Sequence, residues 1–195
     1  VPKKTKRVQY VFRLVFKDLL RIKSKLTSDL DEFLSADTAK LIYADEPYSD
    51  DLYFQATDLL FHRGIENIDV DYIDFEENKA LFPVYDKNSA LPFDVFSAIF
   101  FLVSRYEEYQ PYVPDNHGRF TAHLSVSAAL NFLDKPMVNI WALNIKRIIL
   151  EKYPKMNFPN IVYRFRPTYD IDSAFTFSQK GLVRSVGGYL RAVKE

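Results

Sequence analysis

The sequence predicts a fold of the α/β or α+β class, in which a mixed sheet is flanked by helices. Residues alternate between apolar and polar near the start and the end of the chain, and apolar residues recur at helical spacing in the middle. The chain has 195 residues, of which 48% are hydrophobic and 16% aromatic. This is enough material for one domain with a sizeable core, or for one domain and part of another.

An amphipathic helix is predicted at the start of the chain. Its apolar residues follow helical spacing and comprise Val8, Val11, Phe12, Val15, Leu19 and Ile22. Basic residues precede it, but 26 Lys and Arg balance 26 Asp and Glu over the whole chain. We therefore interpret the basic start as a solvated helix end and expect no nucleic-acid partner.

The region that follows is predicted to alternate strands with one helix. A short strand is expected at 40–44, and a helix from Asp50 or Asp51 to Leu60, ended by Gly64. The alternation around 68–72 and again from Leu81, with Glu76-Glu77-Asn78-Lys79 between the two segments, predicts a hairpin.

The middle of the chain is predicted to be helical. Asp94 is the expected N-cap of a helix that reaches about Tyr106, and its nearly continuous apolar surface predicts the most buried helix of the fold. A second helix is expected from about Asp134 to Lys152, with Pro136 in its first turn. Its predicted inward-facing residues are Trp141, Ile145, Ile148 and Ile149.

The proline-rich stretch 153–159 predicts a domain boundary. We expect an accessory domain at 1–158, and we expect residues 159–195 to form the first part of a second, incomplete domain. In the second domain, alternation through Ile161, Tyr163 and Phe165 predicts a strand that leads into Asp170 and Asp172. Residues i and i+2 of a strand point to the same side, so these two carboxylates can converge on one cation or one water.

A second polar cluster follows the buried helix. It comprises Arg105, Tyr106, Glu107, Glu108, Tyr109, Asp115, His117 and Arg119. One interpretation is a substrate-binding site. The other, which we favour, is a buried ion-pair network that joins Arg105 or Arg119 to Glu107 or Asp115.

Several chemistries are excluded by composition. Without cysteine the chain has no disulfide, no thiolate nucleophile and no Cys-ligated zinc. Its five glycines form no phosphate-binding loop, and neither GxSxG nor HExxH occurs. No apolar run approaches the roughly 20 residues of a membrane span. The compartment stays open between the cytoplasm, which we weakly favour, and export, because the sequence begins with Val1 rather than Met.

The chain resembles the N-terminal region of bacterial polysaccharide deacetylases of the NodB-homology type. The similarity is carried by Leu91-Pro-Phe-Asp94, Ser104-Arg-Tyr-Glu-Glu-Tyr109, Asp115-x-His117-Gly-Arg-Phe120 and Pro167-Thr-Tyr-Asp-Ile-Asp172. In that family a Thr-Phe-Asp-Asp motif ends the first strand of a (β/α) barrel, with one Asp as base and the other as metal ligand beside two histidines. The resemblance implies that Asp170 is the base and Asp172 the ligand of a divalent metal such as zinc, although Ile171 separates the two acids here.

The resemblance also implies a function. We expect an accessory domain at the front of a metal-dependent deacetylase of N-acetylated glycans, followed by the first strand of an incomplete barrel and inactive alone. The alternative is a non-catalytic glycan-binding or protein-interaction domain, and a third possibility is a structural spacer. Exposure of Tyr106, Tyr109 and Tyr112 would favour binding, whereas their burial would favour a structural role. For the apolar tail at 173–195 we expect either mobility or order gained by self-association with a second copy.

Overall fold

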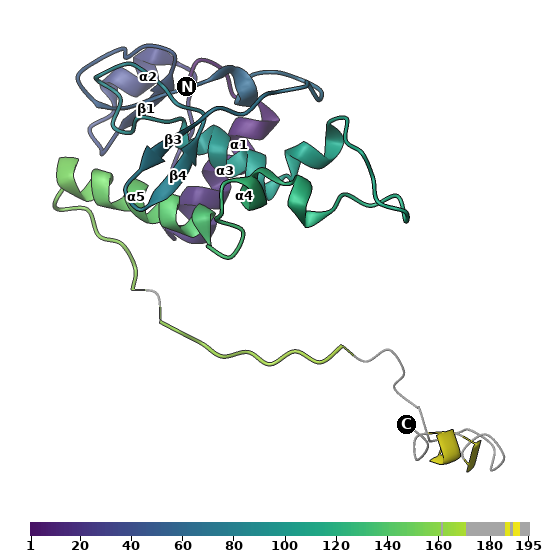
Figure 1. The fold of residues 1–195 in the computed structure, drawn as a ribbon. Coiled ribbons are helices and arrows are strands. Elements are labelled where there is room, and N and C mark those ends of the chain that lie inside the picture. The colour runs from purple at the N-terminus through teal and green to yellow at the C-terminus, as the bar shows by residue number, and fades with distance from the viewer. Residues whose placement is uncertain (161, 171–185, 188, 192–195) are drawn as a thin grey trace. The chain divides into compact units, whose positions relative to one another are not determined.

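The computed structural model describes residues 1–160, 162–170, 186–187 and 189–191. The chain forms two compact units, Val1–Pro159 and Asn160–Glu195 (Figure 1). The first unit is an α+β domain, built from helices and two small sheets. Its longer helices are α1 (Lys6–Phe12), α2 (Leu30–Ser35), α3 (Val95–Val103), α4 (Val126–Ala129) and α5 (Met137–Lys152). Its strands are β1 (Leu41–Ala44), β2 (Leu52–Gln55), β3 (Tyr72–Phe75) and β4 (Asn78–Leu81).

The predicted N-terminal helix is confirmed, but it changes geometry along its length. Thr5 caps α1 by accepting a hydrogen bond from the backbone N–H of Val8. The chain then continues as a π-helical segment, η1 (Arg13–Leu19). The predicted apolar face is buried as far as Val15, and the helical run ends before Arg21, which has a left-handed backbone with φ 57°.

The predicted helix from Asp50 to Leu60 is wrong. Residues Leu52–Gln55 form strand β2, which pairs in parallel with β1 from Leu41↔Leu52 to Ala44↔Gln55. The β1–β2 sheet is buried on both faces, which explains why β2 does not alternate between apolar and polar residues. Tyr43, Leu52 and Phe54 belong to the main core, whereas Ile42, Ala44 and Tyr53 form a smaller cluster with Phe33 of α2. A short 3₁₀ turn, η2 (Asp58–Leu60), follows the strand.

The predicted hairpin is confirmed, with a tighter turn than expected. Strands β3 and β4 pair antiparallel and are joined by Glu76 and Glu77 alone, so Asn78 and Lys79 lie in the second strand. Glu76 takes a left-handed backbone with φ 53°, as two-residue hairpin turns require. The first unit therefore has two separate two-stranded sheets instead of the mixed sheet that the sequence predicts.

Helix α3 is the most buried helix of the first unit, as predicted. Its N-cap Asp94 accepts hydrogen bonds from the backbone N–H groups of Phe96 and Ser97 at 3.1 and 3.0 Å. The helix contacts α1, α5, strand β4 and the short helices η2 and η3 (Tyr106–Tyr109). Helix α5 begins after Pro136, close to the predicted start, and buries all four predicted inward-facing residues.

The described residues of the second unit do not form the predicted strand. Residues 162–170 lie outside helices and strands, and the side chains of Tyr163 and Phe165 are 85% and 77% exposed. An isolated extended segment leaves its backbone groups unpaired, so apolar alternation alone does not make it a strand. Ile161 lies outside the described residues, which contain no closed barrel. None of the described helices is both long and apolar enough to cross a membrane.

Candidate functional site

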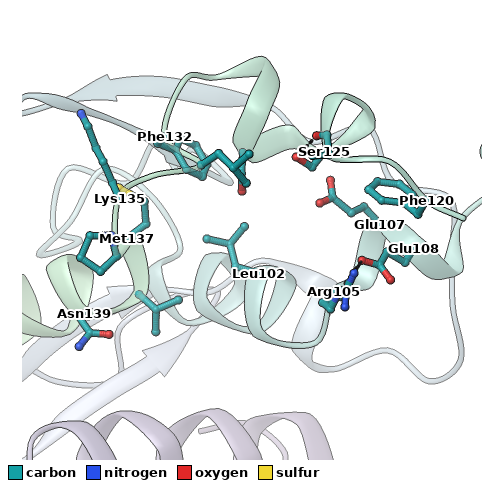
Figure 2. Close-up of a pocket in the computed structure, with 15 residues that line it drawn as sticks. Leu102, Arg105, Glu107, Glu108, Phe120, Ser125, Phe132, Lys135, Met137 and Asn139 are labelled. Carbon is teal, nitrogen blue, oxygen red and sulfur yellow. Dashed lines mark hydrogen bonds and ion pairs between the residues drawn. The ribbon is translucent and has the colours of Figure 1, made fainter. Parts of the chain in front are cut away.

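A pocket of about 510 Å³ lies where α3 ends and α5 begins (Figure 2). Its wall consists of the last turn of α3, the short helix η3, the loop from Phe120 through α4, and the first turn of α5. Leu102 of α3 lies between the two ends of the pocket. One end carries Glu107 and Glu108, and the other carries Lys135 and Asn139 (Figure 2).

The carboxylate end is built by a sharp change of direction after α3. Arg105 adopts the left-handed backbone conformation, with φ 51° and ψ 45°, and its N–H donates to the carbonyl of Leu102. The following helix η3 turns Tyr106 into the core, where it is 2% exposed, and leaves Glu107 and Glu108 in the pocket wall. The Tyr106 hydroxyl accepts a 2.8 Å hydrogen bond from the backbone N–H of Glu66, so Tyr106 anchors this turn.

Glu107 is the half-buried acid of the pocket. One of its oxygens, Oε2, accepts a 2.8 Å hydrogen bond from the backbone N–H of Val126, the first residue of α4. Burial raises the pKa of Glu107 above its ordinary value, and the hydrogen bond from Val126 opposes this rise. Figure 2 shows the carboxyl group inside the pocket near Ser125, so it faces the space that a ligand would occupy.

The predicted ion-pair network is confirmed for Arg119 and Asp115, but its predicted burial and the predicted partners of Arg105 are wrong. Arg105 pairs with Glu108, and its side chain is 70% exposed. Arg119 pairs with Asp115 at 3.7 Å, and its side chain is 68% exposed. Neither arginine pairs with Glu107. Both pairs are therefore surface pairs, because the arginine of each is mostly exposed to solvent.

Asp115 and His117 form a turn of their own. The carboxylate of Asp115 accepts hydrogen bonds from the backbone N–H groups of His117 and Arg119, at 2.8 and 2.9 Å. Gly118 supplies the positive φ of 76° that this turn needs. His117 is exposed and does not line the pocket, so this part of the predicted cluster shapes a loop.

The tyrosines give a mixed result. Tyr106 is buried, whereas Tyr109 and Tyr112 are 67% and 37% exposed. The ring of Tyr112 packs edge-on against Phe120, with centroids 5.1 Å apart. Since Phe120 lines the pocket, Tyr112 supports one of its walls.

The opposite end of the pocket has no counterpart in the predicted cluster. Phe132 is buried there, and Lys135 donates a 2.8 Å hydrogen bond to the side chain of Asn78 in the β3–β4 hairpin. Met137 and Asn139 belong to the first turn of α5. A long loop separates these residues from Glu107 and Glu108 in the sequence. The signal for them in the sequence is Pro136, which predicts the start of a helix but not a binding site.

The two predicted acids of the second unit are placed differently. Asp170 is exposed in the segment 162–170, and Asp172 lies outside the described residues. Within the part of the chain that the structure describes, no three Asp, Glu or His side chains come close enough to hold a metal ion.

Residues 1–154 match the model of DUF7033, a family of unknown function, and the chain belongs to that family. No curated relative and no solved structure was found to match the chain.

Proposed function

We propose that the first unit is a glycan-binding accessory domain of a metal-dependent deacetylase that acts on N-acetylated polysaccharides. The observation that carries this proposal is the pocket of about 510 Å³, in which acidic, basic, amide and aromatic side chains converge. Its volume lies within the usual range for small-molecule sites, roughly 300–1,000 Å³.

The polar groups of the pocket suit an amino sugar. Sugar hydroxyls donate hydrogen bonds to carboxylates, and Glu107 and Glu108 supply two of these. Arg105 and Lys135 supply donors for ring and hydroxyl oxygens. The amide of Asn139 can both donate and accept, which matches the N–H and C=O of an acetamido group.

The apolar groups suit the other faces of the same ligand. A pyranose ring presents C–H groups on its faces, and these pack against aromatic and aliphatic side chains. Phe120 stands at the carboxylate end of the pocket, Leu102 lies between the two ends, and Phe132 provides apolar surface nearer the opposite end (Figure 2). The combination of apolar walls with a few convergent polar groups is typical of a specific ligand site.

The catalytic part of the proposal rests on the resemblance carried by Pro167–Asp172. In it, Asp172 would hold a divalent metal such as zinc, which polarises the acetamide carbonyl. Asp170 would take a proton from the water that attacks this carbonyl. The accessory domain would deliver the glycan.

Binding can be tested by titrating the chain with N-acetylglucosamine oligomers in a calorimeter. We expect Glu107→Gln and Phe120→Ala each to weaken binding about tenfold, the effect of losing one good contact. Glu77→Gln is the matched control, because Glu77 is exposed in the β3–β4 turn and does not line the pocket. Unchanged binding in both pocket variants, or no saturable binding by the wild type, would reject the pocket as a glycan site.

The catalytic part has a separate test. Asp170 and Asp172 supply only one base and one metal ligand, fewer groups than a tight catalytic zinc needs. We therefore expect elemental analysis of this 195-residue chain to find no stoichiometric zinc, and incubation with chitin oligomers to release no acetate. Stoichiometric zinc together with acetate release would show that the chain is a complete enzyme.

A protein-interaction domain is the second candidate. The exposed loop beside the pocket presents Tyr109 and Val113, which are 67% and 82% exposed. Exposed aromatic and aliphatic side chains of this kind occur at protein interfaces. This candidate is favoured if Tyr109→Ala abolishes capture of a protein partner while the glycan titration stays unchanged.

A further inference from the structure

A second hollow of about 510 Å³ lies elsewhere in the first unit and takes no part in the proposed glycan site. It is enclosed by α1 and η1, by the segment from Ile22 to Leu41, and by the C-terminal end of α5. The two pockets share no lining residue. A ligand in this hollow would therefore be bound independently of the proposed glycan site.

The floor of this hollow is hydrocarbon. Phe12, Phe16, Leu52 and Ile149 line it, and each is at least nine-tenths buried. The hydroxyl of Tyr153 contributes no free polar group, because it already bonds to both the backbone N–H and the carbonyl of Lys40, at 3.2 and 2.7 Å. A polar ligand would lose its hydration on such a floor without compensation, whereas an alkyl chain would gain by burial.

The π-helical geometry of η1 shapes one side of the hollow. The backbone N–H of Leu20 bonds to the carbonyl of Val15 at 2.9 Å, and that of Ile22 bonds to the carbonyl of Phe16 at 2.8 Å. Phe16 and Ile22 lie at the two ends of one of these wide turns, and both line the hollow. Segments of π-helix are rare in proteins, and those that do occur are often found at functional sites.

The rim of the hollow is positively charged. Lys23, Lys25 and Lys40 line it, against a single acid, Glu32. Lys25 pairs with Glu32, and Lys40 pairs with Asp51 at 3.6 Å. Lys23 forms no ion pair with the part of the chain that the structure describes. The mouth therefore has an excess of positive charge for an anionic group.

We propose that this hollow binds a single-chain anionic amphiphile, such as a long-chain carboxylate. The alkyl chain lies on Phe12 and Phe16, and the carboxylate lies at the rim near Lys23. Apolar floor and cationic mouth together select for this chemistry, since an uncharged alcohol would leave Lys23 without a partner and a short acid would leave the floor uncovered.

The test is a calorimetric titration of the full 195-residue chain with laurate, below the concentration at which laurate forms micelles. Dodecanol and octanoate are the comparison ligands. We expect one laurate per chain, with dodecanol and octanoate each bound at least about fivefold more weakly, the ratio that one exposed ion pair or a few methylenes provide.

Three variants locate the site. Ala36 and Ala39 line the hollow, so Ala36→Phe and Ala39→Phe should fill it and weaken laurate binding about tenfold or more. Two filling positions guard against one variant failing to fold, which thermal melting will report. Lys23→Glu should weaken laurate but leave dodecanol unchanged, whereas Lys87→Glu, an exposed lysine outside the hollow, should change neither.

The proposal is overturned if laurate shows no saturable binding, or if folded Ala36→Phe and Ala39→Phe bind it as the wild type does. It is overturned equally if dodecanol binds as tightly as laurate, because the hollow would then be a general apolar surface. Laurate binding that Phe120→Ala weakens and both alanine variants leave intact would locate the ligand in the other pocket and reject this site.

Discussion

The carboxylate of Asp94 accepts a 2.9 Å hydrogen bond from the hydroxyl of Tyr43, so that the start of α3 is tied to strand β1 inside the core. The same carboxylate accepts hydrogen bonds from the backbone N–H and the hydroxyl of Thr57, at 2.6 and 2.8 Å. Burial raises the pKa of Asp94, and the hydrogen bonds from Ser97 and Thr57 oppose that rise. Burial and the negative charge of Asp94 raise the pKa of Tyr43. Asp94 therefore joins three segments of the fold.

Removing this carboxylate should destabilise the domain strongly. Asp94→Ala deletes the cap of α3 and leaves the buried hydroxyl of Tyr43 without its acceptor, so we expect a loss on the order of 3 kcal/mol in the free energy of unfolding. Tyr43→Phe removes one donor only and should cost about 1 kcal/mol. Urea denaturation measures both. A smaller loss in Asp94→Ala than in Tyr43→Phe would contradict the central role of the carboxylate.

Arg105 should matter through its backbone rather than its charge. Its pair with Glu108 is exposed, so Arg105→Ala should cost less than about 1 kcal/mol. Arg105→Gly should be more stable than Arg105→Ala by about 1 kcal/mol, because glycine adopts the left-handed conformation without strain. Thermal melting of the two variants decides this. A loss near 3 kcal/mol in Arg105→Ala would restore the buried network that the sequence suggests.

Glu107 predicts a specific pH dependence. Its pKa in the folded state is raised, chiefly by burial, above the ordinary value of 4.5. Just above pH 4.5 the folded protein therefore holds a proton at Glu107 that the unfolded chain has released, and the stability due to this group falls as the pH rises through that window. Glu107→Gln, which cannot titrate, should gain stability relative to the wild type between pH 4.5 and neutrality.

The measurement is a series of urea denaturations of both proteins from pH 4 to pH 7. Glu77→Gln is measured in the same series as the control, because Glu77 is exposed and lies outside the pocket. A difference between wild type and Glu107→Gln that moves in the opposite direction would mean that the Val126 hydrogen bond, and not burial, dominates at this carboxylate.

The tail should drive self-association. Among the described residues of the tail, Val186, Tyr189 and Leu190 are exposed, at 51%, 69% and 62%. Most of the tail lies outside the described residues, so the predicted self-association stays a prediction. Light scattering should show a concentration-dependent mass that Val186→Lys combined with Leu190→Lys lowers, because charges oppose burial of this face. Leu143→Lys, at a comparably exposed position of α5 in the first unit (55% exposed), should not lower it. A wild type that remains monomeric at every concentration would disprove the expectation.

Local signals in the sequence were sufficient for the helices and the hairpin. Asp94 caps the helix it was predicted to cap, and the spacing around Val8 and around Trp141 identified faces that are buried in the structure. A cap and a periodic stripe act within a few residues, so one segment contains the information.

Features that depend on distant partners were missed. Strand β2 has only four residues, and pairing with β1 decides its conformation. The partner of Arg105 depends on its left-handed backbone. An arginine in the sequence gives no signal for this conformation, because glycine is the residue that usually adopts it. Half of the candidate site was recognisable in Arg105–Glu108, but Lys135 and Asn139 come from another segment and carry no motif.

The contact between η1 and α5 joins the beginning of the domain to its end. The ribosome releases α1 and η1 long before α5 has been made. In that interval the apolar side chains of α1 and η1 remain exposed to water, because α5 is not yet there to pack against them. The nascent chain must therefore wait, with α1 and η1 uncovered, until residues near Lys152 emerge from the exit tunnel. During synthesis this domain is expected to fold late and all at once, and the apolar face of α1 and η1 is open to chaperones until then.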